Sequence, residues 1–256
     1  MKFLQSIGCL LEAAFMHSGA YASTLLKVVR SMASPPWYPK LFLQQAEEVG
    51  VQSLPVVLLT ALFTGMVLAL QSYVGFHRFG AESMVATVVS LSMLRELGPV
   101  LVGLMVAGRV GASFAAELGT MRVSEQIDAL WTLSTDPFRY LIMPRFFAVV
   151  LMMPLLVALA DAIGMFGGYI ISVSFLDQTP AVYIENSTTF LKLNDLYSGL
   201  IKAAVFGGII GIVSCSEGFN CSGGAQGVGR ATTRAVVVSA MSILVFDYIL
   251  TAWMFR

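Results

Sequence analysis

Charge is scarce in this chain. Of its 256 residues, 12% are charged and 57% are hydrophobic, which gives a mean hydropathy of +0.81. Soluble domains carry charge on roughly 25% of their residues, so the composition excludes an ordinary soluble domain and indicates an integral membrane protein. The formal net charge is zero, so nothing favours nucleic acid as a partner.

The residue types that build metal centres and disulfide frameworks are few as well. The chain has two histidines and three cysteines, Cys9, Cys215 and Cys221, which form no CxxC pair. A structural metal or a set of disulfides is therefore not expected.

Motifs for catalysis and for nucleotide binding are lacking as well. Without an HExxH motif or a nucleophile beside a base, we expect no enzyme. The glycine-rich residues 223–230 lack a GxxxxGK(S/T) motif, so they predict a flexible turn rather than an ATP site.

Five segments are long and apolar enough to cross a membrane. Residues 49–76 contain no charged side chain, and a span needs about 20 apolar residues. The other four segments carry isolated charges within apolar runs: residues 83–107, 146–176, 196–215 and 235–255. We therefore predict an all-α integral membrane protein whose five transmembrane helices form one domain, residues 49–256.

Positive charge predicts the orientation, because lysine and arginine concentrate on the cytoplasmic side of a membrane. With a cytoplasmic N-terminus, that side holds Lys2, Lys27, Arg30, Lys40, Arg109, Arg122, Arg139, Arg145, Arg230 and Arg234. The opposite side holds Arg78, Lys192 and Arg256. We expect a multi-pass protein with its N-terminus in the cytoplasm and its C-terminus outside.

Residues 1–48 form a separate N-terminal region. Apolar residues recur there at helical spacing: Phe3, Ile7, Leu10, Leu11, Ala14 and Phe15. This pattern predicts an amphipathic interfacial helix on the inner membrane surface, ended by the proline-rich residues 35–39. A partly disordered cytosolic tail is the alternative. Glu12 and His17 interrupt the apolar run, so a signal peptide is not expected.

Charged residues inside the predicted spans are the first candidates for a functional site. They are Arg95, Glu96, Asp161, Lys202 and Asp247. A charge in a bilayer costs at least about 2.5–3.5 kcal/mol, so each needs a partner or water. Our hypothesis is that Glu96, Lys202 and Asp247 meet between spans two, four and five. Asp161 is counted in the same intramembrane charge cluster, and a purely structural clasp is the alternative to a mechanistic role.

Two further features predict how the spans pack. A small residue recurs at every fourth position of the fourth span and twice in the third: Gly199, Ala203, Gly207 and Gly211, then Gly164 and Gly168. Such spacing lets helices approach closely.

Pro99 removes a helical hydrogen bond from the second span, which predicts either a hinge or a fixed bend.

Residues 117–130 predict a short amphipathic helix in the cytosol between spans two and three. Its apolar residues are Leu118, Met121, Ile127 and Leu130, and its polar residues carry both signs of charge. An anionic membrane surface would favour lysine and arginine. Docking into a groove of a partner protein is therefore preferred over lying on the membrane.

The outer end of the first span is large and aromatic, with Leu68, Gln71, Tyr73, Phe76 and Phe79. Aromatic residues at a membrane boundary are commonly interface anchors. Lining a lipid-binding site is the alternative.

Several stretches carry a resemblance when they are taken together. They are GMVLALQ at residues 65–71, SLSMLRELGPVLVGLMVAGRVGASFAAELGTMRVSEQIDAL at 90–130, DPFRYLIMPRF at 136–146, GVGRATTRAVV at 227–237 and LVFDYILTAWMF at 244–255. The chain resembles the MlaE family of ABC-transporter permeases over residues 45–256. The central segment is long and specific, whereas the first 45 residues match only in general character.

The resemblance implies the permease subunit of an ATP-driven transporter. That transporter moves phospholipid between the bacterial inner membrane and a periplasmic MCE-protein carrier and maintains outer-membrane lipid asymmetry. The implied partners are a second copy of the chain, a cytosolic ABC ATPase that binds ATP and magnesium, a membrane-anchored MCE-domain protein and in some cases a STAS-domain protein. The permease itself would bind no cofactor.

The resemblance also implies site residues. The ATPase-coupling helix would present Glu117, Met121, Arg122, Glu125, Gln126 and Asp128. A lipid pocket at the dimer interface would be lined by Leu68, Gln71, Phe76, Phe79, Arg95 and Glu96. Two other classes stay open: an ion-coupled secondary lipid carrier, although the spans show no inverted repeat, and a non-transporting membrane scaffold for an MCE ring.

Overall fold

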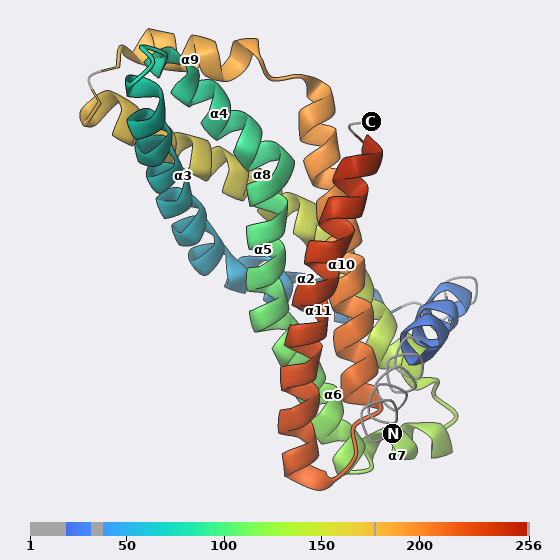
Figure 1. The fold of residues 1–256 in the computed structure, drawn as a ribbon. Helices are drawn as coiled ribbons and strands as arrows, with labels where there is room; N and C mark the ends of the chain where they lie inside the picture. The colour runs from blue at the N-terminus through green and yellow to red at the C-terminus, as the bar shows by residue number, and fades with distance from the viewer. Residues whose placement is uncertain (1–18, 32–37, 177, 255–256) are drawn as a thin grey trace, which may run out of the picture.

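The fold is a bundle of long helices (Figure 1). The computed structural model describes residues 19–31, 38–176 and 178–254, and every regular element within them is a helix. Five helical stretches are long and apolar enough to cross a membrane: Pro39–His77, Glu82–Val123, Phe138–Ser174, Leu193–Phe219 and Gly224–Met254. The predicted all-α membrane fold with five spans is confirmed. The helix predicted from Phe3 to Phe15 lies outside the described residues.

The first stretch contains two helices. α2 (Pro39–Val49) is followed by a 3₁₀ turn (Val51–Ser53) and then by α3 (Leu54–His77). Each helix has a proline in its first turn, where the missing N–H costs nothing because no helical acceptor is available there. α2 buries Ala46 and Val49 and exposes Leu43.

The second stretch is broken twice by π-helical turns. It runs through α4 (Val85–Ser92), a π turn (Met93–Leu97), α5 (Gly98–Val106), a second π turn (Ala107–Gly111) and α6 (Ala112–Val123). The first π turn ends immediately before Gly98 and Pro99. This π turn lies directly before Pro99, where a hinge or a fixed bend is predicted, and π turns within α-helices are frequent at functional sites.

The remaining helices complete the bundle. A π turn (Phe138–Ile142) leads into α8 (Met143–Ser174), followed by α9 (Pro180–Thr189), α10 (Leu193–Phe219) and α11 (Gly224–Met254). Figure 1 shows α9 across one end of the bundle and α7 (Gln126–Thr132) at the opposite end, near the helix of residues 19–31.

The turn predicted over residues 223–230 is much shorter than expected. Gly223 and Gly224 adopt positive φ angles of 93° and 67°, and α11 begins at Gly224. The prediction of a flexible glycine-rich turn is therefore wrong beyond Gly224. The later glycines lie inside a helix, where close packing accounts for one of them: a Cβ at Gly227 would meet the Ser222 backbone.

The predicted close approach of helices at small residues is confirmed. α3 packs along α8, and α10 packs against α8, α6 and α11. The Cα of Gly65 faces the backbone of Gly164 so closely that a Cβ would overlap it. Nearer the start of α8, Gly207 and Gly211 lie against Val149 and Phe146. Small residues thus place these backbones in direct contact.

Replacing Gly65 with alanine tests the contact between α3 and α8. The added methyl group must push the helices apart, so we expect a cost of about 1–3 kcal/mol and a lower melting temperature in mild detergent. Gly75→Ala is the matched control, because Gly75 lies on the same helix with no neighbour within 4 Å. Both variants gain the same helix propensity, so equal melting temperatures would contradict the assigned contact.

Candidate functional site

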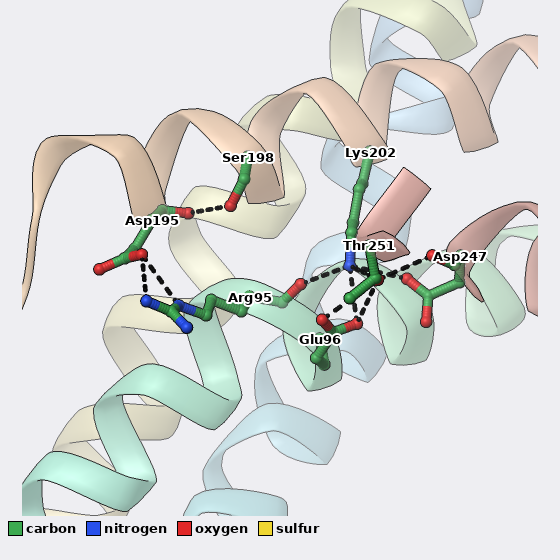
Figure 2. A network of polar contacts seen from close by, with 7 residues as sticks. All are labelled: Arg95, Glu96, Asp195, Ser198, Lys202, Asp247 and Thr251. Carbon is green, nitrogen blue, oxygen red and sulfur yellow. Dashed lines mark hydrogen bonds and ion pairs between the residues drawn. The ribbon is translucent and has the colours of Figure 1, made fainter. Parts of the chain in front are cut away.

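A completely buried lysine joins three of the spans. Lys202 lies on α10, and its Nζ is 2.6 Å from Glu96 Oε2 and 3.0 Å from Asp247 Oδ1 (Figure 2). The structure thus brings together Glu96, Lys202 and Asp247 from the second, fourth and fifth spans. With both acids ionised, one ammonium group faces two carboxylates, and the formal charge of the trio is −1.

The break in the second span exposes backbone acceptors to α10. Pro99 offers no N–H to the carbonyls of Leu94 and Arg95, which lie five and four residues before it. Lys202 Nζ donates to the carbonyl oxygen of Arg95 at 2.9 Å. The carbonyl oxygen of Leu94 lies against Gly199, where a Cβ would collide with it. Residues 199 and 202, three apart on one helix face, therefore lie against these two carbonyl oxygens next to the proline.

Thr251 is a further member of the cluster. Its hydroxyl lies 2.7 Å from Lys202 Nζ, and it can donate to the Asp247 carbonyl oxygen at 2.7 Å or to Glu96 Oε1 at 3.2 Å. Lys202 therefore contacts four oxygen-bearing partners. The Asp247 carboxylate meets it as an ion pair without hydrogen-bond alignment.

Arg95 belongs to a neighbouring pair. Its Nε donates to Asp195 Oδ1 at 2.8 Å, and its Nη2 lies 2.7 Å from the same oxygen. Asp195 also caps α10, because its Oδ2 accepts from the backbone N–H of Lys192 at 3.0 Å. Figure 2 shows Arg95 and Glu96 pointing in different directions, toward Asp195 and Lys202. The Arg95 side chain is 35% exposed.

Sequence reasoning missed both Asp195 and Thr251. Asp195 comes three residues after Lys192, which is the spacing of a reciprocal helix cap. Thr251 follows Asp247 by four residues and so shares its helix face. Both signals are present in the sequence, but neither predicts the partner on another helix.

The placement of Asp161 in the charge cluster is wrong. Asp161 lies on α8, is 2% exposed, and has its carboxyl group against Gly98 of α5. Its Oδ1 has no hydrogen-bond partner among the described residues. Asp161 is not among the groups that contact Lys202, which are Glu96, Asp247, Thr251 and the Arg95 backbone.

The four outer-end lipid candidates occupy two different environments. Leu68 and Phe76 are half-buried against a small cluster of Ala69, Val85, Val89 and Met93. Gln71 and Phe79 are exposed, Phe79 to 83%. Leu68 and Phe76 therefore help to hold α3 against α4, whereas Gln71 and Phe79 are open to contact from outside the chain.

The connector at the other end is not the single helix predicted over residues 117–130. α6 continues from the membrane to Val123, the chain turns at Ser124 and Glu125, and α7 begins at Gln126. Glu125 adopts a left-handed φ of 59°, a conformation that commonly selects glycine. No glycine marks this turn, so the sequence pattern hid it. Arg122 and Asp128 pair across the turn at 2.6 Å.

The coupling candidates point in different directions. Glu125, Gln126 and Asp128 are exposed, whereas Met121 and Arg122 are half-buried. Glu117 turns into the bundle, where its Oε2 accepts from Arg145 of α8 at 2.7 Å. The end of α6 together with α7 and the residue after it, here called the tip, also exposes large apolar side chains that sequence reasoning did not single out. They are Val123, Trp131 and Leu133, which are 42%, 53% and 73% exposed.

The helix of residues 19–31 is fixed to the bundle by polar contacts. Tyr21 donates to Glu217 Oε1 of α10 at 2.6 Å, and Thr24 donates to Ser216. Burial and the Glu217 carboxylate raise the pKa of Tyr21 above its ordinary value, so the phenol keeps its proton and remains a donor at neutral pH.

Comparison with known proteins identifies the family. A family model described as "Permease MlaE" matches residues 42–253. The chain belongs to the MlaE permease family. A probable ABC transporter permease protein of Rickettsia conorii is 52% identical over 256 residues, covering 100% of this chain and 95% of the relative.

Two relatives of lower identity come from another bacterium and from a plant. The intermembrane phospholipid transport system permease protein MlaE of Haemophilus influenzae is 40% identical over 218 residues, 84% of this chain and 83% of the relative. The chloroplastic protein TRIGALACTOSYLDIACYLGLYCEROL 1 of Arabidopsis thaliana is 42% identical over 214 residues, 84% of this chain and 61% of that protein.

Substituting Lys202 with methionine tests the energetic role of the cluster. The change leaves Glu96 and Asp247 without their cation, and breaking a buried ion pair in this way costs about 3–5 kcal/mol. We expect a clear fall in the melting temperature in detergent. Adding Glu96→Gln and Asp247→Asn to Lys202→Met should restore much of the stability, because no uncompensated charge is then left. A triple variant that melts below the single variant would contradict this account.

Proposed function

We propose that this chain is the membrane-spanning permease subunit of an ATP-driven phospholipid transporter in a bacterial inner membrane. The observation that carries the proposal is family membership together with the Haemophilus relative, which is named for intermembrane phospholipid transport. ATP and magnesium would bind to a separate cytosolic ABC ATPase, since the relatives are named as permeases. This chain would supply the path for the lipid and would bind no cofactor.

The polar cluster supports a site that opens beside the spans. Lys202 lies nine residues from the start of α10, which is about 14 Å along the helix, so the cluster is well inside the bundle. The Glu96 side chain is nevertheless 38% exposed in the single chain. Placing that carboxylate among lipid acyl chains, without water or a cation, would cost several kcal/mol of free energy on the order given by membrane-insertion scales. A cavity shared with a second copy of the chain, holding water or a phospholipid headgroup, would accommodate it.

Arg95 is the residue we assign to the headgroup. Its guanidinium has five N–H donors and is 35% exposed while it pairs with Asp195. Arginine recognises phosphate with strong, charge-assisted hydrogen bonds. Leu68, Gln71, Phe76 and Phe79 would contact the acyl chains from α3 and the turn after it. The pocket must hold lipid well in one conformation and poorly in another, because a ligand shifts an equilibrium only through differential affinity.

The tip formed by α6 and α7 is the surface we assign to the ATPase. It carries the exposed acidic residues Glu125 and Asp128, the half-buried Arg122, and exposed apolar residues that include Val123 and Leu133. α6 is the last part of the second span. Movement of a docked ATPase would therefore reach the charge cluster through a helical connection. With this assignment the tip lies in the cytoplasm and the α9 end on the periplasmic side, where an MCE-domain protein would exchange lipid with the permease. A STAS-domain protein would bind the ATPase.

Disrupting the apolar tip tests the coupling surface. In tagged protein purified from its native membrane, Val123→Asp combined with Leu133→Asp should reduce ATPase recovery at least about tenfold, which corresponds to roughly 1.4 kcal/mol. Leu193→Asp is the matched control, because Leu193 is 75% exposed at the α9 end. Mass spectrometry of co-eluting proteins gives the readout. ATPase recovery that is unchanged in the tip variant would favour the scaffold or carrier alternatives.

Removing the Arg95 guanidinium tests the headgroup assignment. Arg95→Ala should lower the amount of phospholipid recovered with the purified complex by severalfold, because a charge-assisted contact contributes about 1.5–3 kcal/mol. Asp195→Ala is the informative companion, since it leaves the guanidinium in place and frees it from its partner. Lipid recovery that stays constant in Arg95→Ala, measured by mass spectrometry of extracted lipids, would count against a headgroup role.

A further inference from the structure

Two hollows meet at Arg139, near the end of the bundle that carries α7. The first is an apolar groove of about 450 Å³ between α2 and the start of α8, lined by Tyr38, Pro39, Phe42, Arg139, Met143, Pro144, Phe147 and Leu151. The second is a polar hollow of about 420 Å³, lined by Lys27, Arg30, Ser31, Trp131, Asp136, Phe138 and Arg139. Both volumes fall in the range of about 300–1,000 Å³ that is usual for small-molecule sites.

The polar hollow is positively charged. Three cationic side chains, Lys27, Arg30 and Arg139, face one carboxylate, Asp136, so the formal charge of the lining is +2. Two of the cations are held in place: Lys27 Nζ lies 4.7 Å from the centre of the Phe138 ring, and Arg139 Nε lies 3.5 Å from Asp136 Oδ2. Arg30 is exposed. This charge is complementary to an anion.

The apolar groove continues into an apolar track along α8. Leu151 lines the groove, and Leu155 and Leu159 follow it at intervals of four residues, all three between 47% and 58% exposed. Residues four apart lie on one helix face, so the track runs about 12 Å along the helix axis. A hydrocarbon chain leaving the groove would find apolar surface along this whole distance.

We propose that the joined hollows form a second lipid site, which binds an anionic phospholipid with its phosphate in the Lys27–Arg30–Arg139 hollow and one acyl chain in the groove. The arrangement matches the chemistry of such a lipid: a basic pocket at the membrane surface beside an apolar groove that opens toward the bilayer. The site is separate from the Lys202 cluster, because the two sets of residues have no member in common and lie on different parts of the bundle. Its occupant would fix α2, α8 and the helix of residues 19–31 relative to one another.

Native mass spectrometry of the full-length protein tests this site. The protein is released from nanodiscs that contain equal amounts of phosphatidylglycerol and phosphatidylcholine, and the ratio of the two retained lipids is measured. We expect phosphatidylglycerol to be preferred. Arg30→Gln and Arg139→Gln should each lower this preference about fivefold, which corresponds to the loss of one cationic contact. Arg122→Gln is the control, because Arg122 pairs with Asp128 outside the two hollows.

Two additional measurements distinguish this site from the transport pocket and from a site for free phosphate. Measuring the same lipid ratio in an Arg95→Ala background lowers the share of retained lipid that comes from the transport pocket, and the preference should persist there. Excess inorganic phosphate should not displace the lipid, because the groove holds its chain. No preference in the wild-type protein, an equal loss in Arg122→Gln, or full displacement by phosphate would overturn the proposal. Arg30→Gln decides the case if Arg139→Gln fails to fold, since Arg30 is exposed.

Discussion

An ammonium group can enter the interior of a membrane protein only if other atoms replace the water it loses. Lys202 is completely buried, and oxygens of Glu96, Asp247, Thr251 and the Arg95 backbone take the place of that water. These oxygens come from two other spans, the second and the fifth. The register of α10 against both spans is thereby fixed, since a shift of one residue would carry the lysine away from its acceptors.

The contacts of Lys202 include a backbone oxygen from the irregular part of the second span. Pro99 removes one backbone N–H directly after a π turn, and the nearby carbonyl oxygens of Leu94 and Arg95 face Gly199 and Lys202 of α10. The second span then continues from Glu96 to Val123, a distance of about 40 Å along the axis. One helical connection therefore links the charged cluster to the exposed tip. A partner that docks at the tip and moves can thereby displace residues inside the membrane.

Much of this could be predicted from the sequence. Long apolar runs indicate the number of spans, and isolated charges within them identify the residues that need partners. Such charges can be paired in several ways, however, which is why the pattern groups Asp161 with Lys202 although Asp161 packs on Gly98. Asp195 gives no comparable signal because it lies at the edge of a span, where charge costs little. The turn at Glu125 has no glycine to mark it, although its backbone is left-handed.

The central claim is that ATP bound by a partner drives lipid through this permease. Its most direct test is the transfer, in either direction, of a labelled phospholipid between proteoliposomes that contain the complete complex and an MCE-domain protein, measured with ATP and again with an ionophore. The account predicts transfer that requires ATP and is unaffected when ion gradients are collapsed. Transfer that proceeds without ATP and stops when the gradients collapse would contradict it and would identify an ion-coupled carrier.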